Sequence, residues 1–127
     1  MENIEQKVLI HPLQAIMISS DEIMRKHILS GEEKITIREG WRNYKPGFSL
    51  IACPFKLYCA GVDITSVRHC LLNEVTEEEY IANNYKSTED MLNDLKRYYP
   101  NLNEKSPVTI IRWDNVRGQL VDELLTE

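Results

Sequence analysis

The chain alternates short apolar runs with polar, turn-rich segments, and this pattern predicts a mixture of short strands and helices. Apolar alternation or short apolar blocks predict strands at residues 15–18, 34–38, 48–54, 60–72 with a bend, and 108–113. Apolar residues at three- and four-residue spacing predict helices at 21–29, 77–83 and 88–98. Several short strands with interspersed helices, and no internal repeat, predict an α+β barrel.

Residues with strong capping preferences mark the ends of two of these helices. Ser19 and Glu22 fit a capping box at the start of the first helix, and Gly31 is expected to end it. Ser87 is expected to begin the third helix, with Asp90 three residues further on. The first helix should therefore lead directly into the next strand.

The predicted strand at 34–38 has one polar face. Lys34, Thr36 and Arg38 share this face because side chains alternate along a strand, and two isoleucines share the other. Such a row could bind phosphate or carboxylate oxygens, with a guanidinium fork from Arg38 and a point charge from Lys34. The alternative is the solvent face of an edge strand, where cations are common.

A loop that mixes aromatic and cationic residues follows this strand. Trp41, Arg42, Tyr44 and Lys45 are candidate ligand-binding residues, because aromatic rings can stack on bases while cations contact phosphate. The alternative interpretation is structural, with Trp41 at the edge of the core and Tyr44 packed against the turn at Pro46.

Length and charge limit the possible functions. A chain of 127 residues with 43% hydrophobic content fits one small domain with a single core. Its formal net charge of −5 argues against general binding to a long nucleic-acid backbone. The expected partner is therefore a nucleotide or a short single-stranded nucleic acid.

The cysteines and apolar runs indicate the cellular compartment. The three cysteines do not suggest a disulfide framework, and they lack the paired short spacings of zinc sites, so no metal and no cofactor is expected. His69 and Cys70 cannot form a nucleophile and its base, since adjacent strand residues face opposite sides. No secretory signal or membrane-spanning run is visible, which predicts a cytoplasmic protein with no membrane contact.

Several landmarks occur along the chain in a specific order. They are the helix end Ile28-Leu29-Ser30-Gly31, then Thr36, Arg38 and Lys45-Pro46-Gly47, the acidic segment 74–79, the segment 94–100 that ends in Tyr-Pro, and the strand at 108–113. This succession resembles the ASCH domain of the PUA-like superfamily. The resemblance implies an α+β fold, a small PUA-like β-barrel with two or three flanking helices, over residues 15–113.

Two segments lie outside this resemblance, an N-terminal extension at 1–14 and a C-terminal extension at 114–127. The second has apolar residues at helical spacing, namely Val116, Leu120, Val121, Leu124 and Leu125. It is predicted to be an amphipathic helix that packs back on the barrel or meets a protein partner.

The chain is similar to the small acetylcytidine amidohydrolases within this family, with one departure. In that branch a lysine two residues after the glycine works with the threonine and a downstream glutamate. Here Glu33 holds the lysine position and Lys34 follows it, and a shift of one residue turns a side chain to the opposite face of a strand. Counting back from Tyr99-Pro100 places the family's glutamate near Asn83 or Asn84.

Three hypotheses follow. The first is an ASCH-type module that binds a nucleotide or nucleic acid, such as RNA or a modified base, in a pocket with Lys34, Thr36 and Arg38. The second is an amidohydrolase for an acylated nucleoside such as acetylcytidine, with Lys34, Thr36 and Glu74 as catalytic residues. The third is a protein-interaction module with a vestigial pocket. The position of the Lys34 side chain distinguishes the first two.

Overall fold

The elements follow the predicted order, with small shifts at their ends. The computed structural model describes residues 13–18, 21–53 and 58–118. In chain order the elements are β1 (Ala15–Met17), α2 (Glu22–Ser30), β2 (Ile35–Glu39), β3 (Gly47–Cys53), β4 (Tyr58–Leu71), the short 3-10 helix η1 (Leu72–Glu74), α3 (Glu77–Ala82), α4 (Thr88–Leu95) and β5 (Pro107–Arg117). The five predicted strands and three predicted helices are thus confirmed.

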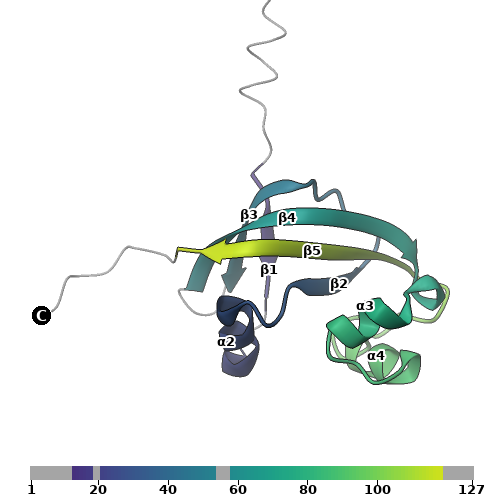
Figure 1. The fold of residues 1–127 in the computed structure, drawn as a ribbon. Coiled ribbons are helices and arrows are strands. Elements are labelled where there is room, and N and C mark those ends of the chain that lie inside the picture. The colour runs from purple at the N-terminus through teal and green to yellow at the C-terminus, as the bar shows by residue number, and fades with distance from the viewer. Residues whose placement is uncertain (1–12, 19–20, 54–57, 119–127) are drawn as a thin grey trace, which may run out of the picture.

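The strands form a single mixed sheet that curls into a half-barrel (Figure 1). Its order is β1-β3-β4-β5-β2, with β1 parallel to β3 and the other neighbours antiparallel. The pairing of β4 with β5 shifts register between Gly61 and Asp63 and again between Ile64 and Ser66. These irregularities bend the long strand, as the sequence predicts, because a bulge increases local twist.

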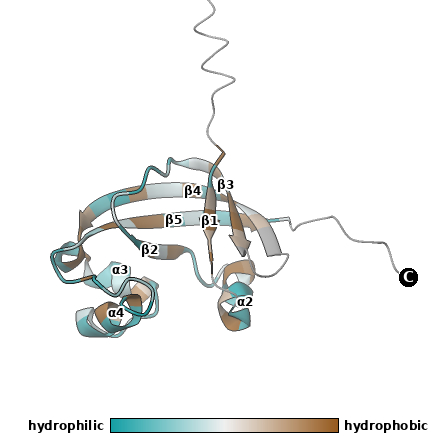
Figure 2. Cartoon of the chain, turned by 180° about the vertical axis from the view of Figure 1, so that it is seen from behind, coloured by the Kyte–Doolittle hydropathy of each residue, from teal (hydrophilic) through white to brown (hydrophobic). Residues whose placement is uncertain are grey.

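Two apolar clusters form the core. The first contains Ile35 and Ile37 of β2 with residues of β4, β5 and α4, and the second contains residues of β1, α2, β3, β4 and β5. Ile110 and Ile111 are neighbours on β5 and belong to different clusters, since successive strand residues point to opposite faces. Figure 2 shows brown, hydrophobic segments on β1, β2, β3 and β5.

The first helix begins at a different cap from the predicted one. Asp21 is the N-cap, and its carboxylate accepts hydrogen bonds from the N–H groups of Ile23 at 2.9 Å and Met24 at 3.4 Å. Glu22 is the first helical residue, so it is not placed to complete a capping box with Ser19, which lies outside the described residues. Gly31 ends the helix with φ of 84°, a left-handed conformation that glycine adopts without strain.

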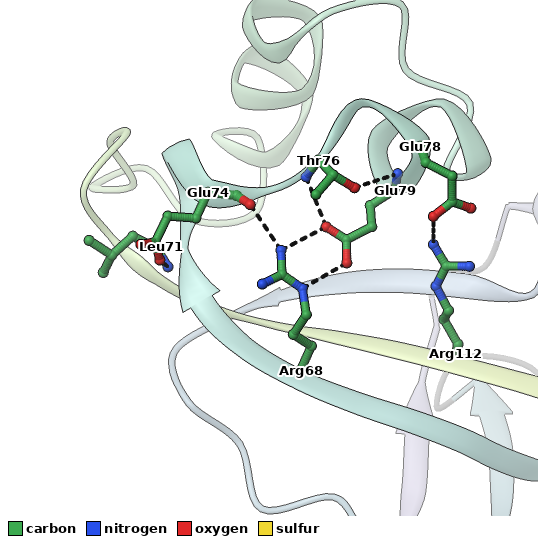
Figure 3. Close-up of polar contacts among 7 residues, drawn as sticks. All are labelled: Arg68, Leu71, Glu74, Thr76, Glu78, Glu79 and Arg112. Atoms are coloured by element: carbon green, nitrogen blue, oxygen red, sulfur yellow. Dashed lines mark hydrogen bonds and ion pairs between the residues drawn. The ribbon is translucent and has the colours of Figure 1, made fainter.

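A partly buried ion pair fastens the α3–α4 segment to the sheet (Figure 3). Arg68 of β4 donates from Nε and Nη2 to the two carboxylate oxygens of Glu79 at 2.8 and 2.9 Å, and also to the Glu74 carbonyl at 2.9 Å. Glu79 in turn closes a capping box with Thr76. Burial raises the pKa of Glu79, but the hydrogen bonds from Arg68 and Thr76 outweigh it and hold the pKa below its usual range.

The C-terminal part of the chain departs from the prediction. Residues 114–117 continue β5, because they pair with β4 as far as Arg117 opposite Gly61. Arg117 also donates to Asp63 at 3.0 Å. The predicted helix is therefore wrong for Val116, and residues 119–127 lie outside the described part of the chain, as do 1–12. Among the described residues, no helix has the length and apolar character that crossing a membrane requires.

We expect Glu79→Gln to lower the free energy of unfolding by about 1–3 kcal/mol, because an amide nitrogen would then face the Arg68 guanidinium. Since the folded state lowers the pKa of Glu79, this contribution is complete above pH of about 4.3 and is lost as pH falls through the folded pKa. Urea denaturation from pH 7 to pH 3 measures both effects.

The matched control is Glu78→Gln. Glu78 pairs with Arg112 at 2.6 Å, but the Glu78 side chain is 71% exposed. The free energy of unfolding should therefore fall by less than about 1 kcal/mol. Equal losses for the two variants would contradict the structural role given to Glu79.

Candidate functional site

The described residues enclose a cavity of about 650 Å³ beneath the half-barrel. Its walls come from the end of β1, from α2, from β2, and from the segment that joins α3 to α4 and continues past α4. Figure 1 shows α2 and the α3–α4 pair on the same side of the sheet, with β2 running between them. Trp113 of β5 completes the lining. A volume of this size suits a small molecule such as a nucleoside.

The side chains of β2 divide between core and cavity. Ile35 and Ile37 are buried in the core, although Ile37 also borders the cavity, whereas Thr36 and Arg38 are half-buried and line the cavity. Thr36 pairs with Ile111 and Arg38 with Thr109 across the strands, which sets this alternation. The structure therefore brings together two of the three polar residues predicted for this face.

Lys34 is the third of these polar residues, and it lies outside the cavity lining. Its ammonium pairs with the Asp114 carboxylate at 3.2 Å, and it borders a small separate hollow. The strand begins one residue later, at Ile35, while the Lys34 carbonyl accepts from the Trp113 N–H at 3.0 Å. The prediction that Lys34 shares the pocket with Thr36 fails because a partner on β5 holds its side chain.

Glu33 occupies the cavity in its place. Its N–H donates to the His27 carbonyl at 3.0 Å, which fixes the backbone just after α2. Its carboxylate accepts a hydrogen bond of 3.4 Å from Nδ2 of Asn84. Burial raises the pKa of Glu33, and the nearby His27 and Arg38 offset this effect in part. A carboxylate and an amide thus meet where the sequence comparison placed the family's lysine and glutamate.

The wall opposite β2 contains a linked polar group. Tyr85 donates from its hydroxyl to Asp94 at 2.7 Å, and Arg97 pairs with the same carboxylate at 2.8 Å. Burial, followed by the Asp94 hydrogen bond, raises the pKa of Tyr85. Tyr98 lies beside this group with its ring 5.2 Å from the Arg97 guanidinium carbon, and it is 52% exposed. Asp94 is therefore well partnered, and Tyr98 offers an aromatic face at the rim.

Two buried donors among the lining residues have no hydrogen-bond partner in the described part of the chain. They are Nε of Arg38 and Nε1 of Trp113. Buried donors are almost always paired in folded proteins, and an unpaired one costs roughly 1–3 kcal/mol. Both atoms are closed to solvent, so they lie within the packed wall of the cavity.

The lining is acidic on balance. Four carboxylates, from Asp21, Glu33, Asp90 and Asp94, face two guanidinium groups, from Arg38 and Arg97. Among the described residues, no group of three or more His, Cys, Asp or Glu side chains is arranged to hold a metal ion. The acidic balance therefore favours a ligand rich in hydrogen-bond donors.

The loop after β2 folds away from the cavity. Trp41 donates from Nε1 to the Cys70 carbonyl at 3.3 Å and packs at 6.1 Å from the His69 ring, although 65% of Trp41 is exposed. Arg42 donates through Nε to the Glu39 carbonyl at 2.8 Å. These contacts hold the start of the loop against β4 and β5.

The second half of the loop is tied to the N-terminal strand. Tyr44 donates from its hydroxyl to the Ala15 carbonyl at 3.0 Å, and the Lys45 N–H donates to Gln14 at 3.0 Å. Neither residue lines the cavity, and neither do Trp41 and Arg42. The structure thus separates all four loop candidates from Thr36 and Arg38.

Glu74 is also distant from the cavity lining. Its carboxylate accepts from the Leu71 N–H at 2.8 Å, at the turn between β4 and η1. Lys34, Thr36 and Glu74 therefore do not converge on one site.

Sequence reasoning did not select several residues that line the cavity. His27, Tyr85, Asp94 and Trp113 come from α2, from the segments around α4 and from β5. The sequence did contain a signal for Glu33 and Asn84. Glu33 lies two residues after Gly31, and Asn84 was reached by counting back from Tyr99-Pro100. The docking of α4 beside β2 is a tertiary contact with no local signature.

Comparisons with known proteins agree on the fold. The chain is similar to the ASCH domain from Lactobacillus crispatus JV V101, with a TM-score of 0.61 and 16% identity over 89% of this chain and 84% of that one. It is similar to the hypothetical protein PH0355, with a TM-score of 0.57 and 23% identity over 80% of this chain and 98% of that one. It is also similar to the ZmASCH S128A mutant protein from Zymomonas mobilis, with a TM-score of 0.54 and 14% identity over 80% of this chain and 68% of that one. No family model and no curated protein matches the sequence.

The chain therefore has the fold of the ASCH domain, an α+β half-barrel of the PUA-like type, as the order of sequence landmarks implied. At these levels of identity the likeness defines the architecture, and the function has to be argued from the cavity itself.

We expect Glu33→Gln to raise stability at pH 7 by less than about 1 kcal/mol, because partial burial disfavours the charged form of the carboxylate and water screens the site. The folded state raises the pKa of Glu33, so the wild type loses stability as pH rises from about 4.3 through the folded pKa. Below about pH 4 the variant and the wild type should unfold at the same temperature.

Thermal unfolding across this pH range provides the measurement. Glu32→Gln is the matched control, since Glu32 is exposed and accepts a hydrogen bond from Ser30 at 3.0 Å outside the cavity. A destabilised Glu33→Gln at pH 7 would show that the carboxylate is a structural partner of Arg38 or His27.

Proposed function

We propose that the chain is a binding module that takes a single nucleobase, of a nucleoside or of a nucleotide in a short strand, into the cavity between α2, β2 and α4. The observation that carries this proposal is a cavity of about 650 Å³ whose lining combines Glu33, Thr36, Arg38 and Asn84 with the exposed ring of Tyr98. A cavity of this size can hold a base, and side chains of these kinds can hydrogen-bond to its edge.

The cavity contains the two kinds of contact that a base requires. Polar groups at its floor come from Glu33, Thr36, Arg38 and Asn84. Apolar and aromatic groups stand at its rim, where Ile23 is 66% exposed and Tyr98 is 52% exposed. A base can hydrogen-bond along its edge and pack its faces against such groups.

The acidic balance of the lining argues that phosphate remains outside. Four carboxylates near the ligand would repel a buried phosphate, in keeping with the formal net charge of −5. The base, and not the backbone, would then provide most of the binding free energy.

The amidohydrolase hypothesis receives less support from this arrangement. The described lining contains no lysine, and Asn84 stands where the family's acid is expected. An amide side chain cannot act as a general base at neutral pH, and no group in the lining replaces the lysine cation at the same position.

Arg38→Ala should weaken binding of the preferred nucleoside by about tenfold or more while changing the free energy of unfolding by less than about 1 kcal/mol. The reason is that Arg38 lines the cavity, where a guanidinium can donate charge-assisted hydrogen bonds to a ligand. The chain has two tryptophans, so Trp41→Phe leaves Trp113 as the only one, and its fluorescence reports on the cavity.

Titrations of Trp41→Phe with nucleosides, with and without Arg38→Ala, supply the measurement. Arg42→Ala is the matched control, because Arg42 lies outside the cavity, and it should leave affinity unchanged. No fluorescence change with any nucleoside would contradict the proposed function.

Purified protein should not release acetate from acetylcytidine. The expectation rests on the position of Lys34, whose ammonium pairs with Asp114 away from Thr36. Product formation followed by chromatography over many hours tests it, and Lys34→Ala serves as the comparison. Turnover that depends on Lys34 would favour the hydrolase.

A further inference from the structure

The Glu33 side chain is the acid in the cavity best placed to receive a ligand. Asp94 is already engaged by Tyr85 and Arg97. Asp21 caps α2, and Asp90 accepts from the Lys86 N–H at 2.9 Å. The hydrogen bond that Glu33 accepts from Asn84 is long, at 3.4 Å, so its carboxylate has free acceptor capacity.

The hydrogen-bond acceptors and the hydrogen-bond donors of this cavity come from different side chains. Glu33 contributes two carboxylate oxygens and Asn84 one amide oxygen, since Asn84 directs its amide nitrogen to Glu33. Arg38 contributes its guanidinium. Arg38 and Glu33 line the same cavity and lie only five residues apart along the chain. A suitable ligand therefore carries adjacent donors next to adjacent acceptors.

On this basis, and resting on the proposed function, the geometry points to guanine as the preferred base. Guanine has two neighbouring donors, N1–H and the N2 amino group, which a carboxylate can accept with both oxygens. It also has the acceptors O6 and N7, which suit an arginine fork. The assignment places the N1 and N2 edge against Glu33 and the O6 and N7 edge toward Arg38.

The other bases fit this arrangement less well. Adenine and cytosine each have a single amino donor with a ring acceptor beside it, and that acceptor would meet a carboxylate oxygen. Uracil has one ring donor between two carbonyl oxygens. Acetylation of cytosine removes one of its amino hydrogens, so acetylcytidine offers Glu33 still less.

Nucleoside titrations of the full chain carrying Trp41→Phe test the assignment, with guanosine, inosine, 1-methylguanosine, adenosine, cytidine and acetylcytidine as probes. Guanosine should bind most tightly. Inosine lacks the N2 amino group and 1-methylguanosine lacks the N1 hydrogen, so each should bind roughly tenfold or more weakly.

Glu33→Gln provides the decisive variant. A glutamine amide offers one acceptor and one donor group, so the preference for guanosine over inosine should fall to within about twofold. Thermal unfolding of the same variant at pH 7 is the control for loss of folding. Glu32→Gln, the matched neighbour outside the cavity, should keep the wild-type ranking.

The outcomes separate this inference from the proposed function. Binding of cytidine or acetylcytidine as tight as that of guanosine, or a Glu33→Gln variant that keeps the preference over inosine, overturns the guanine assignment and leaves a base-binding cavity. Absence of binding by every nucleoside overturns both.

Discussion

The ion pair between Arg68 and Glu79 is the polar contact on which the shape of the cavity depends. It joins β4 to α3 at 2.8 Å, with both carboxylate oxygens engaged and the Thr76 capping box holding Glu79 in place. Because α3 leads directly to Asn84 and Tyr85, this contact sets the position of the cavity wall opposite β2. The apolar packing of Met91 and Leu95 then orients α4 on the same core. Removing Arg68 would leave the buried Glu79 carboxylate without its cation, so the pair favours one arrangement of the segment.

The charge distribution of the cavity follows from the backbone just before β2. Two hydrogen bonds, from the Glu33 N–H to His27 and from the Trp113 N–H to the Lys34 carbonyl, fix successive residues against different elements. Glu33 consequently enters the cavity and Lys34 reaches Asp114. Where the sequence resemblance implies a lysine, this cavity carries the carboxylate of Glu33, which accepts hydrogen bonds when it is ionised.

Much of the architecture could be predicted from local patterns. Gly31 and Ser87 mark helix ends, and the alternation of Ile35, Thr36, Ile37 and Arg38 gives the two faces of β2, because these signals act within a few residues. The cap at Asp21 and the extension of β5 through Val116 were not predicted. In the second case cross-strand pairing with β4 overrides a helical spacing of apolar residues.

The site was less predictable than the fold, for a related reason. The alternation of side chains along β2 correctly placed Thr36 and Arg38 on one face, but it also placed Lys34 there. In the structure the Lys34 ammonium pairs with Asp114, which lies 80 positions further along the chain. The aromatic and cationic residues of the loop after β2 looked suited to a ligand, yet their hydrogen bonds go to backbone carbonyls of the fold. Contacts between segments far apart in the sequence therefore determine which of these residues line the cavity.

The half-barrel is open between β1 and β2, which form the two edges of the sheet, and the cavity lies along this opening. In the described part of the chain these two strands do not pair with each other, so no ladder of backbone hydrogen bonds fixes the distance between them. The width of the cavity is set instead by side-chain packing of α2 against both apolar and polar neighbours, and packing tolerates changes in side-chain size better than a hydrogen-bonded ladder does. A substitution on α2 would therefore change the width of the cavity while leaving the hydrogen-bonded sheet intact.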